Sequence, residues 1–363
     1  MIQRRTFLGT VLGASVCLTS RGLLASPTKP RDWSSQVIQT VRHGELKRRP
    51  IVTGVSLQPQ GNLLAIVGDD HYVSLYDMAT NGYAEHLNEH KDWVRDAKFS
   101  PDGKMLFTCG NDHQLIGWST DDLSESAFST RRKDAIIKLA ISSDSQQIAS
   151  VGFNRDLVIH DASTGRERDR FRCPCDDIHA VAFSADGKLV AAGGRCGTIR
   201  VWNLDKSKKA HEFKSHRRRI RSLEFSESGD LVSAGDDQIV RVNKLDDPMS
   251  SFALPRHAAK LFAVKVISPS VIATSGSDNQ IHIWNLDNLS EIGLLSDHTG
   301  TVSSLDFSQG KLVSGSFDAT ARIWTIDPDE LAKGVLPPTF STPSSSPSAS
   351  ASRSVTPGVW TRR

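Results

Sequence analysis

The chain has 363 residues, of which 38% are apolar and 23% are charged, which is ordinary for a soluble globular protein. Its formal net charge is +3, but residues 1–25 contain three arginines and no acidic residue, so the rest of the chain holds equal numbers of acidic and basic residues. This balance excludes a charge-based argument for nucleic-acid binding, and we expect no nucleic-acid partner.

The N-terminus has the features of a signal peptide. Arg4 and Arg5 are followed by Phe7 and Leu8, and a short, weakly apolar stretch comes next. The stretch is too short for a membrane span, which needs about 20 apolar residues. A basic start, a short apolar segment and small residues near the cleavage point are typical of signal peptides. The pattern resembles the bacterial twin-arginine export signal.

That resemblance implies export to the periplasm or cell envelope, with a cytoplasmic protein as the alternative. We assign residues 1–25 to the signal peptide and residues 26–33 to a linker. No later segment is long and apolar enough to span a bilayer, so we expect no membrane span in the mature chain.

A motif that recurs seven times dominates the remaining sequence. Its copies are 40 to 42 residues apart and end at Tyr76, Trp118, His160, Trp202, Asn243, Trp284 and Trp324. Repeats of this length that end in a short strand are typical of β-propellers, in which each repeat forms one four-stranded blade. The sequence therefore predicts an all-β, seven-bladed propeller over residues 34–326.

The second copy shows the motif most clearly. Pro101 and Gly103 belong to a tight turn after the first strand, because proline fixes φ and glycine tolerates a positive φ. Asp112 starts the next hairpin, and Trp118 ends the third strand. The same order of turn, hairpin and anchor recurs in the other copies.

These repeats resemble the WD-repeat family over residues 34–326, although no copy has the literal Trp-Asp pair. The resemblance implies a non-catalytic scaffold that binds other proteins. It also implies a buried hydrogen-bond chain of His, Ser or Thr, Asp and Trp within three blades, namely His90, Thr108, Asp112 and Trp118; His257, Thr274, Asp278 and Trp284; and His298, Ser314, Asp318 and Trp324. Blade five matches less well because Asn243 replaces the tryptophan, and Arg48, Arg132 and Pro174 replace the histidine in blades one, three and four.

The ends of the repeat region predict how the ring closes. Blade seven lacks a fourth strand, and residues 35–42 alternate polar and apolar side chains. We predict that this N-terminal strand joins the last blade, which would cover an exposed sheet edge. Residues 327–363 are rich in Ser, Pro and Thr, which predicts a disordered tail.

Three cysteines fall in the fourth repeat, and Cys109 is expected to be a buried thiol. By alignment with the family, Cys196 occupies the aspartate position, and Pro174 occupies the histidine position. We therefore predict a disulfide between Cys196 and Cys175, or Cys173, as an exported protein would permit. A zinc site made of the three thiolates and His179, or free thiols, are the alternatives.

Basic residues cluster in the loops that lead into first strands and in one hairpin. They are Lys47, Arg48, Arg49, Arg131, Arg132, Lys133, Arg195, Arg217, Arg218 and Arg219. The resemblance places these loops and the Asp hairpins on one face of the ring. We interpret them as a candidate binding face for an acidic protein, with ordinary solvated loop charge as the alternative.

No catalytic, cofactor or metal motif is apparent, so we expect a protein that is not an enzyme and needs no cofactor. The alternative is a propeller enzyme, a hydrolase or a lactonase-like metal enzyme, with its site in the central channel. Such a site would need inward-pointing carboxylates and histidines, whereas the positions expected to point inward are mostly small or apolar. The sequence does not predict the oligomeric state.

Overall fold

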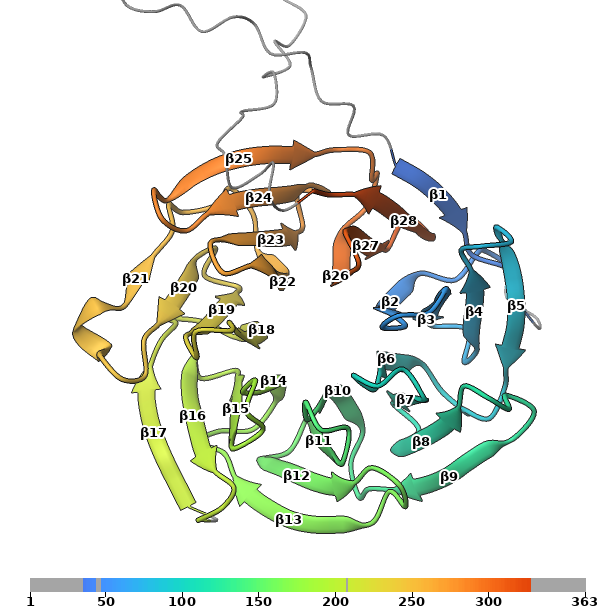
Figure 1. The fold of residues 1–363 in the computed structure, drawn as a ribbon, viewed down its shortest axis with the longest axis horizontal. Coiled ribbons are helices and arrows are strands. Elements are labelled where there is room, and N and C mark those ends of the chain that lie inside the picture. Colours follow the sequence, from blue (N-terminus) through green and yellow to red (C-terminus); the bar gives the residue numbers. More distant parts are fainter. Residues whose placement is uncertain (1–34, 44–46, 207, 328–363) are drawn as a thin grey trace, which may run out of the picture. The chain divides into compact units, whose positions relative to one another are not determined.

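The computed structural model describes residues 35–43, 47–206 and 208–327, which belong to one compact unit. The signal peptide, the linker and nearly all of the tail therefore lie outside the described residues. Within them the chain forms seven four-stranded antiparallel sheets arranged as a ring (Figure 1). The predicted all-β, seven-bladed propeller is confirmed.

Each blade is built from strands that follow one another from the centre of the ring to its rim. Blades one to three consist of β2 (Val52–Leu57), β3 (Leu63–Gly68), β4 (Val73–Asp77) and β5 (Gly82–Leu87); β6 (Val94–Phe99), β7 (Met105–Gly110), β8 (Gln114–Ser119) and β9 (Ser126–Arg131); and β10 (Ile136–Ile141), β11 (Gln147–Gly152), β12 (Asp156–Asp161) and β13 (Glu167–Arg172). Blades four and five consist of β14 (Ile178–Phe183), β15 (Leu189–Gly194), β16 (Thr198–Asn203) and β17 (Lys208–Lys214); and β18 (Ile220–Phe225), β19 (Leu231–Gly235), β20 (Val240–Asn243) and β21 (Phe252–Ala253), with the short 3-10 turn η1 (Pro248–Ser250) before β21.

Blade six has the same plan, and blade seven takes its outer strand from elsewhere in the chain. These two blades consist of β22 (Leu261–Ser268), β23 (Val271–Gly276), β24 (Ile281–Asn285) and β25 (Ser290–Leu295); and β26 (Val302–Ser308), β27 (Lys311–Ser316), β28 (Thr320–Thr325) and the N-terminal β1 (Ser35–Gln39).

The ring is closed by β1, as predicted. It pairs antiparallel with β28, from Ser35 opposite Trp324 to Gln39 opposite Thr320. Ile38 is buried in the hydrophobic cluster that joins blades seven and one. The strand ends at Gln39 rather than at residue 42. Thr40 N still donates to Ala319 O of blade seven at 3.1 Å, and the Thr40 hydroxyl donates to Pro50 O, just before blade one, at 3.0 Å.

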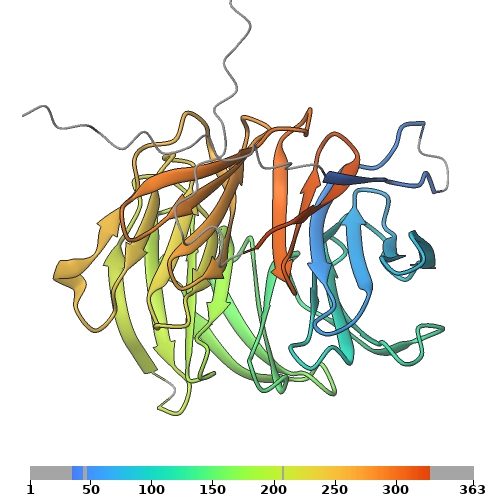
Figure 2. The ribbon, with the colours of Figure 1, turned by 45° about the horizontal axis from the view of Figure 1, so that its top comes forward.

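The turns of the motif adopt the backbone that their residues favour. Gly103 and Gly187 have φ near +70° in the turns between first and second strands. In the hairpins between second and third strands, a carboxylate accepts the backbone N–H two residues later, at 3.1 Å for Asp112 and 3.0 Å for Asp318. Figure 2 shows the turns at the two ends of the strands on two separate faces of the ring.

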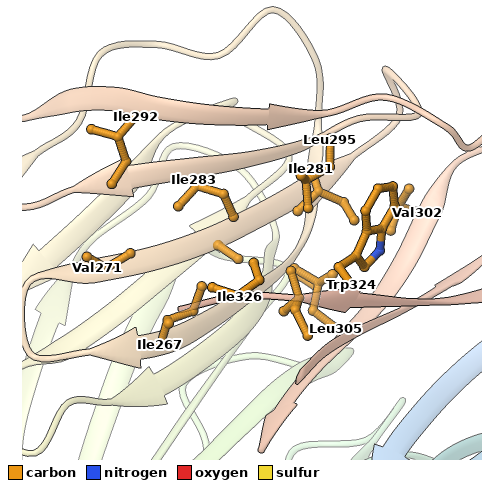
Figure 3. Packing of buried hydrophobic residues seen from close by; sticks show 13 residues of the cluster. Ile267, Val271, Ile281, Ile283, Ile292, Leu295, Val302, Leu305, Trp324 and Ile326 are labelled. Carbon is orange, nitrogen blue, oxygen red and sulfur yellow. The ribbon is translucent and has the colours of Figure 1, made fainter. Parts of the chain in front are cut away.

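Hydrophobic packing between blades holds the ring together. In the cluster of Figure 3, Ile281 and Leu295 of blade six meet Val302, Leu305 and Trp324 of blade seven, and all of them are at most 5% exposed. Burying a large apolar side chain contributes roughly 1.5–3 kcal/mol. A blade could not bury this surface alone, which explains why the repeats fold as one ring.

Candidate binding face

The loops leading into the first strands lie beside the hairpins between second and third strands, as expected. In blade two, Asn111 N donates to Trp93 O at 2.9 Å, and in blade four Arg195 N donates to Asp177 O at 3.1 Å. Equivalent bonds join Asp236 to Arg219 and Phe317 to Thr301. We call the surface formed by these hairpins and loops the hairpin face.

In blades two and seven the predicted four-residue hydrogen-bond chain is present beneath the hairpin face. His90 Nδ1 donates to Asp112 Oδ2 at 2.9 Å, the Thr108 hydroxyl donates to His90 Nε2 at 2.9 Å, and Trp118 Nε1 donates to Thr108 Oγ1 at 3.0 Å. The bond from His90 holds the pKa of Asp112 below its usual range, although burial opposes this shift.

Blade seven repeats the arrangement with a serine. Ser314 lies 2.7 Å from His298 Nε2 and 2.9 Å from Trp324 Nε1, and His298 Nδ1 lies 2.8 Å from Asp318. Blade five keeps the contacts of His216 with Asp237 and Ser233, both at 2.8 Å. These histidines are buried and bonded at both ring nitrogens, so they serve structure rather than catalysis.

The prediction for blade six is wrong. Both ring nitrogens of His257, the hydroxyl of Thr274 and the indole N–H of Trp284 are buried without a hydrogen-bond partner. The carboxylate of Asp278 is instead 3.1 Å from Nε2 of His282. The four positions of the motif do not include this second imidazole, which lies two residues before Trp284.

Arg132 is not part of an exposed binding surface, which corrects a second prediction. It is 9% exposed and donates to the carbonyl oxygen and hydroxyl of Ser150 at 2.8 and 2.9 Å, and to Asp156 O at 3.0 Å. Ser150 in turn donates to His160 Nε2 at 2.7 Å. Arg132 thus takes the place of the missing histidine in blade three.

Blade four has a disulfide where other blades have their polar chain. Cys175 and Cys196 are bonded, with 6.1 Å between their Cα atoms, which confirms the first of the predicted pairings. Cys173 and Cys109 are buried free thiols, and burial raises the pKa of Cys173 to about 12. The zinc alternative is wrong, because two of its thiols are oxidised and His179 is bonded to Asp177 at 2.7 Å.

The remaining basic residues of the predicted face divide into paired and unpaired groups. Arg48 is paired with Asp69, Arg219 is paired with Asp177, and Arg49 donates to Gln39. Within the described part of the chain, the exposed side chains without an ion-pair partner are those of Lys47, Arg131, Lys133, Arg195, Arg217 and Arg218.

The central channel contains more charge than the sequence predicted. It is a cavity of about 540 Å³ lined by the innermost strand of every blade. Lys265 Nζ lies 2.8 Å from Glu224 and 3.3 Å from Asp306, and Lys138 Nζ lies 3.1 Å from Asp96. Most residues that line the channel are small or apolar, as expected, but the sequence did not predict these paired charges among them.

Carboxylates on the innermost strands join one blade to the next. Asp96 accepts the backbone N–H of Leu139 at 3.0 Å, Glu224 accepts that of Val266 at 2.8 Å, and Asp306 accepts that of Leu57 at 2.9 Å. Each acceptor and donor belong to consecutive blades. These bonds give the acidic groups a structural role, and no set of three His, Cys, Asp or Glu side chains in the described residues is arranged to hold a metal ion.

Two exposed aromatic residues on the hairpin face, in blades three and seven, were not predicted from the sequence. Phe153 is 48% exposed and Phe317 is 41% exposed, at hairpin positions where other blades have Asp69, Asn111 or Asp236. The guanidinium of Arg221 lies 4.9 Å from the centre of the Phe262 ring. Comparing the residue before each hairpin Asp or Asn across the seven repeats would have revealed the two exposed phenylalanines.

Seven blades, Asp hairpins and repeated polar chains define a WD-type β-propeller. A family model described as the IFT122 first beta-propeller matches residues 51–325. This match covers most of the chain, so the chain belongs to this family of WD-repeat propellers. In the described residues we find no helix with the length and apolar character needed to cross a membrane.

Three relatives match short segments of the chain, which spans at most 16% of their length. The Periodic tryptophan protein 2 homolog of Neurospora crassa is 44% identical over 70 residues, which is 18% of this chain and 8% of that protein. The U3 snoRNP-associated protein-like EMB2271 of Arabidopsis thaliana is 36% identical over 75 residues, 20% of this chain and 16% of that protein. The WD repeat-containing protein WDS homolog of Arabidopsis thaliana is 38% identical over 61 residues, 16% of this chain and 12% of that protein.

Proposed function

We propose that this protein is a non-catalytic scaffold that binds an acidic protein partner through its hairpin face. WD-repeat propellers generally bind other proteins and are generally not enzymes. The proposal rests on a contrast between side chains that are bonded inside the ring and side chains that are exposed on the hairpin face. The buried His–Asp pairs and the carboxylates on the innermost strands are bonded within the ring, whereas exposed arginines and phenylalanines on the hairpin face have unused binding capacity.

The composition of the hairpin face supports protein binding. Aromatic residues and arginine are enriched in protein interfaces, and they supply much of the energy of association. Phe153 and Phe317 expose large apolar areas there, and Arg217 and Arg218 have no ion-pair partner among the described residues. Unpaired cations favour an acidic partner and increase its rate of association.

Export to the cell envelope is the second part of the proposal. It rests on the twin-arginine pattern at Arg4 and Arg5. The Cys175–Cys196 disulfide supports it, because such bonds persist in oxidising compartments. Cell fractionation tests this part: the wild-type protein should be in the envelope fraction, and a variant with Arg4→Lys and Arg5→Lys should remain in the cytoplasm. Wild-type protein in the cytoplasm would refute export.

Quantitative affinity purification from the native organism tests the scaffold. The full-length tagged protein should recover at least one protein in a fixed ratio, and raised salt should weaken that association because unpaired cations contribute to it. Recovery of no protein above an untagged control, at low salt and after crosslinking, would refute the scaffold function.

A further inference from the structure

Five basic side chains gather on one shoulder of the ring, at the hairpin-face end of blade four. We define the blade-four shoulder as Arg172, Arg195, Lys214, Arg217 and Arg218. All five are exposed, and none has a carboxylate partner within the described part of the chain. Arg172 and Lys214 were not among the residues predicted from the sequence.

Backbone contacts bring these residues together from three parts of the chain. Arg200 Nη1 donates to Arg172 O at 2.6 Å, which holds the end of β13 against β16. The Lys214 ammonium donates to the carbonyl oxygen of Cys196, next to Arg195. Figure 1 shows β13 and β17 as neighbouring outer strands of blades three and four.

Further bonds fix the same hairpin to the loop that carries Arg217 and Arg218. The backbone N–H groups of Ser215 and His216 donate to Gly197 O at 3.0 and 2.8 Å. The Cys175–Cys196 disulfide connects the hairpin to the segment that follows Arg172. The shoulder is thus held in place before any partner binds, which lowers the entropy cost of association.

The acidic residues around the shoulder are already engaged elsewhere. Asp176 is paired with Arg155 at 2.7 Å, and Glu212 is paired with Arg200. Asp177 is bonded to His179 and Arg219, and the buried Asp237 is bonded to His216. None of these carboxylates contacts a side chain of the shoulder, so the positive charge of the shoulder is not neutralised by a direct ion pair.

We propose that the blade-four shoulder binds a short acidic segment of a partner protein. This inference rests on the scaffold function proposed above and gives it a location. Four of the five cations are arginines, whose guanidinium groups bind carboxylates in a bidentate manner. A long nucleic acid fits less well, because residues 35–327 contain more Asp and Glu than Lys and Arg and would repel an extended polyanion.

Fluorescence anisotropy with a short, labelled poly-glutamate peptide tests the shoulder on the full-length protein. The test variant combines Arg195→Glu, Arg217→Glu and Arg218→Glu. A matched control combines Lys104→Glu, Lys188→Glu and Lys206→Glu, which makes the same change in net charge at exposed positions away from the hairpin face. Circular dichroism establishes that both variants are folded.

We expect the shoulder variant to bind the peptide at least about tenfold more weakly, and the control to change the affinity by less than about twofold. Equal weakening in both variants, or no weakening in the shoulder variant, would overturn the inference. So would absence of peptide binding, including the case in which labelled single-stranded DNA or phosphatidylserine vesicles bind instead. If the native partner is recovered equally well by the shoulder variant, the location is wrong while the scaffold function stands; recovery of no partner by the wild type refutes the scaffold function itself.

Discussion

Nε2 of His282 lies 3.1 Å from Oδ2 of Asp278, the carboxylate that His257 would bind if blade six resembled blades two and seven. Nδ1 of His282 also lies 2.8 Å from Glu291. Burial lowers the pKa of His282, but the bonds to Asp278 and Glu291 outweigh burial and raise it to about 9. Burial, followed by the nearby charge of His282, lowers the pKa of His257 to about 4. In blade six the positive charge is therefore on His282 and not on His257.

This arrangement predicts a specific pH dependence of stability. A folded pKa near 9, above the unfolded value of about 6.5, means that the contribution of His282 is complete below about pH 6.5 and is lost as the pH rises through 9. Between about pH 6 and pH 10, the free energy of unfolding in urea should fall by about 2 kcal/mol more for the wild type than for His282→Gln. His113→Gln, in a hairpin position where blade five has Gln238, is the control. An equal pH dependence of the free energy of unfolding for the wild type and His282→Gln would show that the pKa of His282 is not raised in the folded protein.

Two threonines in equivalent positions should respond differently to removal of the hydroxyl. Thr108→Val leaves His90 Nε2 and Trp118 Nε1 without their shared partner, so unfolding should require about 2 kcal/mol less free energy. The hydroxyl of Thr274 has no partner to lose, so Thr274→Val should change the free energy of unfolding by less than about 0.5 kcal/mol. Similar costs for the two variants would show that blade six contains the same bonded chain as blade two.

The buried Arg132 and its exposed neighbour Arg131 should differ in their contribution to stability. Arg132→Met removes three hydrogen bonds from a buried guanidinium and should lower the free energy of unfolding by about 3 kcal/mol. Arg131→Met, at an exposed neighbouring position, should stay within about 0.5 kcal/mol. Urea titration of both purified variants measures the difference. A small effect of Arg132→Met would show that Arg132 is exposed in solution rather than buried against Ser150.

The closing strand β1 should be required for stability through its buried side only. Ile38→Ala deletes a side chain that is 3% exposed and should cost about 3 kcal/mol. Val37→Ala, at a side chain that is 42% exposed, should cost less than about 1 kcal/mol. Equal melting temperatures for the two variants would mean that β1 does not close the ring in solution.

The disulfide should stabilise the ring by about 3 kcal/mol in the chain-entropy model, because it connects residues separated by 21 positions. Dithiothreitol should lower the unfolding midpoint of the wild type but leave a variant with Cys175→Ala and Cys196→Ala unchanged. The double variant should also bind the poly-glutamate peptide more weakly, since its hairpin is no longer tied to the segment after Arg172. A reductant effect of equal size in both proteins would assign the stabilisation to something other than this bond.

The sequence predicted the features that depend on repetition. Seven anchors at nearly constant spacing, with Asp hairpins and Gly turns between them, are sufficient to predict the blades, and the unpaired edge of blade seven predicted β1. Comparing one repeat with the others predicted a disulfide from Cys196 to Cys175 or Cys173, and the structure has the bond to Cys175. Each of these inferences used a position that has the same surroundings in every blade.

The features that the sequence did not predict depend on contacts specific to one blade. His282 binds Asp278 because it lies four residues later, on the strand that follows the hairpin. Nothing in the family pattern assigns this role to His282. Arg132 looked like a loop charge, yet its side chain extends inward to Ser150. The charges on the innermost strands were missed because Asp96 and Asp306 bond to the next blade, a contact between repeats that a comparison of repeats does not show.

Crosslinking of the full-length protein to its native partner, followed by mass spectrometry of the linked lysines, tests whether the partner binds the hairpin face. The hairpin face carries the exposed Lys47, Lys91, Lys133, Lys214 and Lys260, while Lys104 and Lys188 lie in turns on the opposite face. We predict that partner crosslinks concentrate on the first group, with Lys214 prominent among them. Crosslinks confined to Lys104 and Lys188, with none on the hairpin face, would show that the partner binds the opposite face instead.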